Sequence, residues 1–315
     1  MSLHPNTKTA KHLSSIGVVV ICILAASFAR ANPYLAKPGE APVTVYVATC
    51  AVSGGFIQLY TALDQNLFEK YGIAVKHVVI RGGTNINLAA LGADEVQFLY
   101  CAADATIPGM ATGSDAKLIA APLIGLPWVL LTRKDIKRPE ELKGKSIAVT
   151  RPGDLTFRLA RALLKKFNLT ENDVKILTVG GTGQVEPFNA MRSGFAEAAL
   201  VTPPLDVRGR RDGFSLIYRL NDLGLPAVYS SLHTNAKTLR ERPQLVQKWV
   251  AALAESIQFV KKTPDKGKAA VSKALKLNDA DALQSAYDAY AKLLVNRRLT
   301  VPESSVAGVI EVARE

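Results

Sequence analysis

Small and polar residues follow three apolar runs of the chain, and each time a run with helical spacing comes next. The three sets are Ser53-Gly54-Gly55, Gly82-Gly83-Thr84, and Gly153-Asp154 with Thr156. A helix start presents unpaired backbone N–H groups and the positive end of the helix dipole, which favour an anionic or strongly hydrogen-bonding ligand. A tight strand-to-helix turn without a ligand explains any one of these loops equally well, and Asp154 is also a suitable helix cap. Taken together, the three loops predict one binding site.

Two arginines, Arg81 and Arg151, stand at the ends of predicted strands. A guanidinium can form two parallel hydrogen bonds with a carboxylate or a sulfonate, so both are candidate ligand contacts; the alternative is a solvated charge at the rim. The small-residue loops beginning at Thr49 and at Ala102 belong to the same predicted site. Aromatic and proline residues are candidates for an apolar wall, although aromatic rings at strand ends also pack in cores: Tyr100, Trp128, Pro203, Pro204 and Tyr229.

Signals for hydrolytic or metal chemistry are missing. Beyond the N-terminal segment the only histidines are His77 and His233, which are far apart and lack the spacing of metal ligands. No serine lies in a nucleophile-elbow motif. We therefore predict no metal, no cofactor and no enzymatic activity.

The N-terminus resembles a secretory signal peptide. Lys8 and Lys11 precede an apolar run at 16–25, and Ala29-Arg30-Ala31 offers small residues around a cleavage point. A membrane anchor is the alternative, but the uncharged stretch 13–29 is at the short end of what crosses a bilayer and contains three serines. We predict that residues 1–31 are removed and that the protein is exported.

Composition is that of an ordinary globular protein. The 315 residues are 48% hydrophobic and 21% charged, and no second apolar stretch reaches membrane length. The formal net charge is +12, but the densest basic patches, 208–211 and 261–262, lack interleaved aromatic residues. Nucleic acid is therefore not an expected partner.

Strands and helices alternate along most of the chain. Short apolar runs at 43–48, 74–80, 96–100 and 118–121 belong to a first series, and those at 128–132, 146–149, 174–179 and 198–201 to a second. A further strand at 227–232 precedes a tail that is almost entirely helical from Pro243 onward. Alternation of this kind predicts parallel sheets.

The fold class is therefore α/β, with two lobes and a helical C-terminal part. We expect residues 42–127 to begin the first lobe, 128–226 to form the second, and 227–315 to return to the first. The chain is long enough for each lobe to bury its own core. Ligands of open parallel sheets bind beyond the carboxyl ends of the strands, so the loops above should meet in a cleft. The lobes should close on ligand about crossings near 128–133 and 226–229.

Several segments carry a resemblance to a known family. Ala62-Leu-Asp-Gln-Asn-Leu-Phe-Glu-Lys-Tyr-Gly-Ile73, Gly82-Gly83-Thr84, Leu91-Gly92-Ala93-Asp94 and Arg138-Pro-Glu-Glu-Leu-Lys-Gly-Lys-Ser-Ile-Ala-Val149 resemble the nitrate/sulfonate/taurine-type substrate-binding proteins of bacterial ABC importers. The resemblance implies a type II periplasmic-binding-protein fold, location in the periplasm, and a monomer that delivers a small solute to a permease in the inner membrane. The superfamily includes binders of thiamine-pyrimidine precursors, so the ligand class stays open.

Two alternatives to transport remain. An exported sensor could use the same fold without a transporter. Cys50 stands just after the first predicted strand, where it resembles the nucleophilic cysteine of a desulfinase with this fold. That chemistry requires a thiolate of low pKa and a nearby base, and His77 lies several residues before the cleft end of its strand, so we expect binding rather than catalysis.

Cys50 follows the first strand and Cys101 follows the third. In the sheet order that the resemblance implies, these strands are neighbours, so an oxidising compartment permits a disulfide between them. Because the ends of adjacent strands often splay, we favour two separate thiols.

Overall fold

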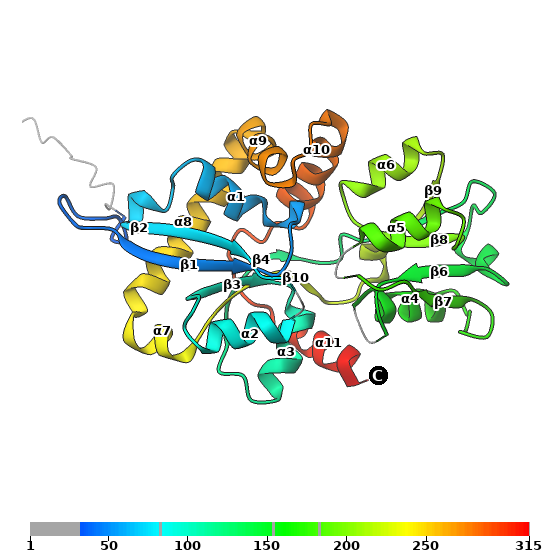
Figure 1. The fold of residues 1–315 in the computed structure, drawn as a ribbon, viewed down its shortest axis with the longest axis horizontal. Helices are drawn as coiled ribbons and strands as arrows, with labels where there is room; N and C mark the ends of the chain where they lie inside the picture. The colour runs from blue at the N-terminus through cyan, green and yellow to red at the C-terminus, as the bar shows by residue number, and fades with distance from the viewer. Residues whose placement is uncertain (1–31, 82–83, 153–154, 182–183, 315) are drawn as a thin grey trace, which may run out of the picture. The chain divides into compact units, whose positions relative to one another are not determined.

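The computed structural model describes residues 32–81, 84–152, 155–181 and 184–314 (Figure 1). Its strands form two five-stranded sheets, each with helices on its faces, and helices make up most of the C-terminal part. The predicted α/β class with two lobes is confirmed. No helix among the described residues is both long and apolar enough to span a bilayer.

The first sheet has the order β2-β1-β3-β10-β4. In chain order, its strands are β1 (Val43–Thr49), β2 (Ile73–Val79), β3 (Phe98–Cys101), β4 (Lys117–Ile124) and β10 (Val228–Thr234). The second sheet has the order β7-β6-β8-β5-β9. Its strands are β5 (Val129–Thr132), β6 (Ser146–Val149), β7 (Lys175–Thr178), β8 (Ala198–Val201) and β9 (Ser215–Arg219).

Both sheets are mixed, so the expectation of parallel sheets is only partly correct. In the first sheet β10 runs antiparallel to β3 and β4, and in the second β5 runs antiparallel to β8 and β9. These two strands are the ones that the chain enters directly from the other sheet. Strands joined by a helix within one sheet must run parallel, but a strand that arrives from elsewhere is free of that constraint.

The chain crosses between the sheets twice, at 125–128 and at 220–227. The first crossing comes earlier than the expected 128–133, because Val129–Thr132 is already strand β5. Two elements of the second lobe were not predicted at all, helix α6 (Leu205–Arg211) and strand β9. The division of the chain into domains at 42–127, 128–226 and 227–315 stays a prediction.

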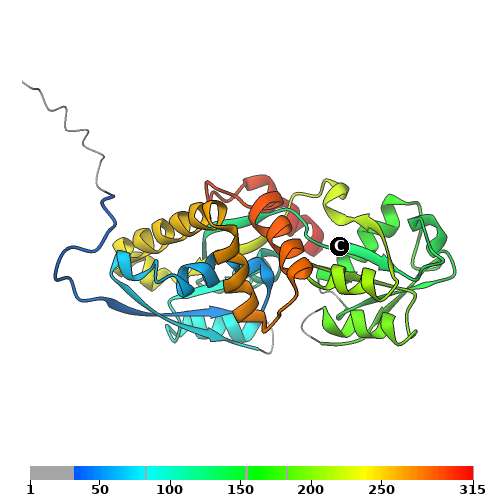
Figure 2. The same cartoon turned by 90° about the horizontal axis from the view of Figure 1, so that it is seen from above.

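Helices of the first lobe come from both ends of the chain. They are α1 (Ile57–Asp64), α2 (Thr84–Gly92), α3 (Ala103–Ala111), α7 (Ala236–Glu241), α8 (Pro243–Lys262), α9 (Pro264–Leu275), α10 (Ala280–Tyr287) and α11 (Glu303–Arg314), with short turns η1 (Gly54–Phe56), η2 (Glu69–Tyr71) and η5 (Asp288–Leu293). Helix α1 packs against α8 and α9, which lie about 200 residues later in the chain (Figure 2). The second lobe has α4 (Leu155–Lys166), α5 (Val185–Arg192) and α6, with turns η3 (Pro139–Leu142) and η4 (Leu220–Leu223).

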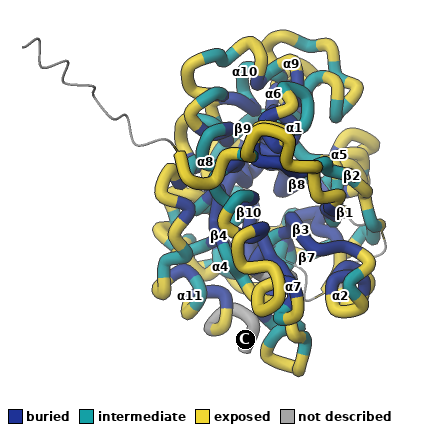
Figure 3. The backbone as a smooth tube through the Cα atoms, turned by 90° about the vertical axis from the view of Figure 1, so that its left-hand side faces the viewer, coloured by how far each residue is buried: buried dark blue, intermediate teal, exposed yellow. Residues whose placement is uncertain are grey.

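Apolar side chains fill both faces of each sheet, which explains why the central strands are apolar throughout. In the first lobe the indole of Trp249 stacks on Phe68 and Phe98, with ring centroids 4.3 and 4.2 Å apart. In the second lobe Leu159 and Leu163 of α4 pack on one face of the sheet, and Phe188 of α5 packs on the other. The central strands β3, β5, β6 and β8 are fully buried, whereas most residues of the edge strands β2, β7 and β9 are half-buried or exposed (Figure 3).

Candidate functional site at the strand ends

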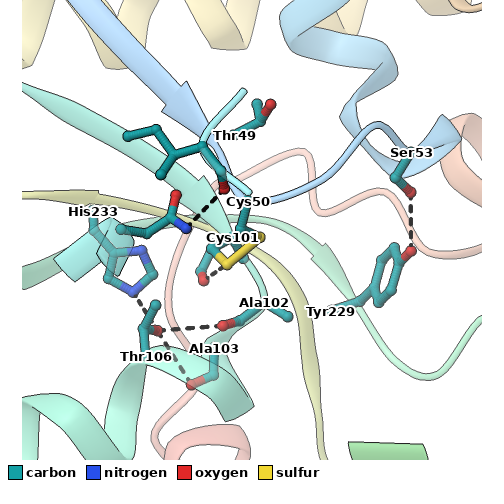
Figure 4. The surroundings of a disulfide bond; sticks show 12 residues. Thr49, Cys50, Ser53, Cys101, Ala102, Ala103, Thr106, Tyr229 and His233 are labelled. Atoms are coloured by element: carbon teal, nitrogen blue, oxygen red, sulfur yellow. Dashed lines mark hydrogen bonds between the residues drawn. A yellow bond between two sulfur atoms is a disulfide. The ribbon is translucent and has the colours of Figure 1, made fainter. Parts of the chain in front are cut away.

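Cys50 and Cys101 form a disulfide at the carboxyl ends of β1 and β3, with Cα atoms 5.4 Å apart (Figure 4). The expectation of two separate thiols was wrong. The ends of the two strands do not splay, because parallel pairing continues to Thr49 opposite Tyr100 and the backbone N–H of Cys50 donates to the carbonyl of Tyr100 at 3.2 Å. This bond anchors the start of the loop that leads to Ser53.

Ser53 and Tyr229 meet at this edge although they are 176 residues apart. The Ser53 Oγ lies 3.2 Å from the Tyr229 hydroxyl (Figure 4). It also accepts a hydrogen bond from the backbone N–H of Gly55 at 3.1 Å. A Cβ atom at Gly55 would lie 2.5 Å from Cε1 of Tyr229. Glycine is therefore required here for the close approach of the tyrosine ring.

An aromatic row continues from Tyr229 in both directions. Trp128 meets its ring edge-on at 5.1 Å, and Tyr290 stacks on it at 5.6 Å. The Tyr290 hydroxyl donates to the carbonyl of Pro203 at 3.0 Å. The row therefore links η5 of the first lobe to the loop after β8 in the second lobe. Burial raises the pKa of Tyr290 well above its ordinary value, which keeps the hydroxyl protonated as a donor.

Sequence reasoning missed Tyr290 because it lies in a helical tail with no loop or strand-end signal beside it. Gly54 was predicted as part of an anion-binding loop, but a Cβ there would approach Cε2 of Tyr290 to 3.0 Å. Packing of the aromatic row therefore accounts for both Gly54 and Gly55. Pro203 and Pro204, also predicted, join the row through the bond from Tyr290 and are linked to each other by a cis peptide bond.

Two predicted threonines already have partners within the protein. The Thr49 Oγ1 is buried and lies 3.0 Å from Nε2 of His77, whose pKa is lowered by burial. The Thr156 Oγ1 accepts from the backbone N–H of Thr150 at 3.1 Å and lies 2.8 Å from its hydroxyl. These contacts shape the loops before α1 and α4, so both side chains act in loop structure here.

Tyr100 does not line a surface. Its side chain is completely buried in the core of the first lobe, where it meets Phe56 edge-on at 5.8 Å. It points to this core because residues of β3 alternate between the two faces of the sheet. Ala102 is half-buried and precedes α3, so it can contribute only backbone groups.

Arg81 and Arg151 are exposed and follow β2 and β6, as predicted from the sequence. Neither forms an ion pair with a carboxylate among the residues that the structure describes. Of the other predicted residues, Thr84 begins α2, whereas Gly82, Gly83, Gly153 and Asp154 lie outside the described residues. The described part of the chain holds no cluster of His, Cys, Asp or Glu that could bind a metal ion.

A cavity of about 840 Å³ lies to one side of the predicted loops. The cavity is in contact with the aromatic row at Trp128 and Tyr229. From Leu155, the first residue of α4, it extends along this helix and reaches Glu171 in the turn that follows it. Of the described side chains predicted for the apolar wall of the site, Trp128 and Tyr229 line it. We call this cavity the α4 groove.

Two mixed α/β sheets connected by two crossings, with polar loops and arginines at the strand ends, define a periplasmic-binding-protein-like fold. A model of the NMT1/THI5 like family matches residues 53–267, and the chain belongs to this family.

Solved structures share the fold at low sequence identity. The periplasmic aliphatic sulphonate binding protein SsuA of Escherichia coli superimposes with a TM-score of 0.72 at 18% identity, covering 87% of this chain and 86% of that protein. The alkanesulfonate-binding protein SsuA of Xanthomonas axonopodis pv. citri, bound to MOPS, has a TM-score of 0.66 at 16% identity, covering 87% and 91%. A Brachyspira hyodysenteriae protein named as an ABC transporter periplasmic binding protein is 24% identical over 273 residues, covering 82% of this chain and 76% of its own.

Proposed function

We propose that this protein is an extracytoplasmic solute-binding protein that captures a small organic anion, of the sulfonate type or similar, and delivers it to an ABC permease in the inner membrane. The observation that carries the proposal is the pair of exposed arginines, Arg81 and Arg151, at strand ends of the two sheets with no carboxylate partner among the described residues. An exposed guanidinium that pairs with no described carboxylate can form the two parallel hydrogen bonds that a sulfonate or carboxylate accepts. The names of the SsuA neighbours support the same ligand class.

The proposal is tested by calorimetry and thermal shift with the chain from residue 32 onward. Alkanesulfonates, taurine, nitrate, carboxylates and pyrimidines are screened, and a ligand present at 100 times its Kd should add about 2.7 kcal/mol to the unfolding free energy. Arg81→Ala and Arg151→Ala should each weaken binding of the anion about tenfold, since each removes a hydrogen bond to a charged group. Arg298→Ala is the control, because Arg298 is exposed and lies between η5 and α11. Equal affinity in all three variants would remove the arginines from the site.

Transport also requires export. We propose that residues 1–31 are cleaved as a signal peptide and that the mature protein is a periplasmic monomer. Mass spectrometry of the protein from the periplasmic fraction and size-exclusion chromatography test both points. An intact N-terminus retained in the membrane fraction would favour an anchor instead.

Ligand capture by hinge closure is the third part of the proposal. Helices α6 and α10 already meet beside the site: the Ser285 hydroxyl donates to both carboxylate oxygens of the buried Asp206 at 3.0 and 3.1 Å, and Arg211 pairs with Asp279 and Asp281. Opening on this side must break these contacts. Ser285→Ala should therefore raise the radius of gyration of the unliganded protein in small-angle scattering, and ligand should lower it. An unchanged radius at saturating ligand argues against closure.

The alternative of a cysteine enzyme loses its nucleophile, because the Cys50 thiol is consumed in the disulfide. Turnover of a sulfinate by the reduced protein would restore that alternative. An exported sensor remains the other candidate, and a regulator gene in place of permease and ATPase genes beside this one would favour it.

A further inference from the structure

The α4 groove has an apolar floor formed by segments from both lobes. Leu155, Leu159 and Ala162 of α4 line one side, and Leu225 and Pro226 of the second crossing line the back. The helix has apolar residues on more than one face, because Leu159 and Leu163 also pack on the second sheet. Leu159 is buried in the core of the second lobe and Leu155 packs against that core, so the floor of the groove is the outer edge of the core.

Helix α11 forms the opposite wall through a close contact with the second crossing. A Cβ at Gly308 would lie 2.8 Å from both Cγ and the carbonyl oxygen of Pro226. Only glycine allows this approach, which brings Val309 to the groove. The groove is thus a built feature of the fold with a volume of about 840 Å³, which is within the usual range of small-molecule sites, roughly 300–1,000 Å³.

The rim of the groove is cationic. Among its described lining residues Arg158, Arg161, Lys165 and Lys166 carry positive charge, and Glu171 is the one carboxylate. The Glu171 carboxylate is already paired with Arg161 at 2.9 Å. Lys165 and Lys166, in the last turn of α4, form no ion pair with a described residue. Lysines in a last turn also complement the helix dipole, so the charge becomes informative only in combination with the apolar floor.

We propose that the α4 groove binds a single-chain anionic amphiphile, with the alkyl chain on the apolar floor toward Trp128 and the anionic head group at Lys165 and Lys166. An apolar tail alone would leave the cationic rim unused, and a small hydrophilic anion would leave the floor exposed. A cavity of this volume accommodates one such molecule. This site is distinct from the solute site proposed at the strand ends, and the two share Trp128 and Tyr229.

The test uses decyl sulfate below its micelle concentration and isothermal titration calorimetry with the mature protein. Binding should show one site, and each methylene removed on going to octyl and hexyl sulfate should weaken it about fourfold, as expected for burial of the chain. Decanol, which lacks the charge, should bind at least tenfold more weakly. Several equivalent sites, or affinity independent of chain length, would overturn the proposal.

Variants locate the site. Lys165→Glu with Lys166→Glu should weaken decyl sulfate binding at least tenfold, and Ala162→Trp, which fills the groove, should abolish it. Lys261→Glu with Lys262→Glu is the matched control, because these exposed lysines occupy the last turn of α8, in the other lobe. Equal losses in both double variants would assign binding to general surface charge and overturn the proposal. Binding to anionic phosphatidylglycerol vesicles but not to free decyl sulfate would point to a membrane surface and overturn it too.

The strand-end solute provides the independent readout. The affinity for this solute should be unchanged in the Lys165/Lys166 double variant. Arg81→Ala should instead weaken binding of the solute and leave the affinity for decyl sulfate unchanged. Competition between the two ligands at equal stoichiometry would show that decyl sulfate occupies the solute site, and would refute a second site without affecting the first proposal.

Discussion

Reduction of the Cys50–Cys101 disulfide should destabilise the protein measurably. The two residues are 51 positions apart, so the bond closes a loop of about 50 residues in the unfolded chain. In the chain-entropy model a loop of this length contributes about 4 kcal/mol to the unfolding free energy. For a chain of this size, with about 2.1 cal/mol/K of unfolding entropy per residue, that corresponds to a fall in Tm of about 7 °C.

Differential scanning calorimetry with and without dithiothreitol measures the effect, and thiol counting under denaturing conditions establishes the redox state. The Cys50→Ser/Cys101→Ser variant is the control: its Tm should match that of the reduced protein and should not respond to dithiothreitol. If the fully reduced protein keeps the Tm of the oxidised one, the entropy argument fails. Two free thiols in the exported protein before reduction would refute the bond itself.

Two further changes test the packing of the site and the buried histidine. Gly55→Ala should cost about 1–3 kcal/mol in urea unfolding, because its Cβ must displace the Tyr229 ring, which lies 2.5 Å from that position; Gly92→Ala, whose Cβ meets nothing closer than 3.5 Å, should not destabilise, and equal effects would contradict the packing argument. His233 is buried, and burial lowers its pKa from 6.5 to about 4. As the pH falls below 6.5, the unfolded state therefore binds a proton before the folded state does. His233 leaves the unfolding free energy unchanged above pH 6.5 and lowers it by up to about 3 kcal/mol between pH 6.5 and 4. Urea unfolding across this range should show the loss, and His233→Gln should flatten it; an unchanged slope would assign the acid sensitivity to other groups.

Local signals predicted the central strands well. Ser146–Val149 and Ala198–Val201 have the predicted bounds, because strands buried on both faces are continuously apolar and end where small or polar loop residues begin. The strand Ser215–Arg219 was missed, because it lies at the edge of its sheet, its five residues are at most half-buried, and its apolar run, Leu216-Ile217-Tyr218, is short. Strand direction was also beyond local reasoning, as β5 and β10 show.

Only part of the candidate site could be anticipated. Ser53 and Tyr229 were each recognised as residues at the end or start of an element, but nothing in the sequence indicates that their hydroxyl groups meet. The ligand-binding role of Gly54 and Gly55 stays a prediction, and the structure adds that Tyr290 and Tyr229 occupy the space that a side chain at these positions would need. A glycine can indicate that there is no space for a side chain at its position, but the sequence does not identify the neighbouring group that occupies that space.

The sequence by itself determined the alternation of strands and helices, the positions of the loops, and the two cysteines and two arginines at strand ends. These features depend on side-chain periodicity and backbone preference within a few residues, which any stretch of chain carries with it. The tertiary structure decided that Cys50 bonds to Cys101, that Trp128, Tyr229 and Tyr290 form one row, and that α4 faces a cationic groove. Each of these rests on contacts between residues tens to hundreds of positions apart, which exist only once the sheets have formed and their edges have met.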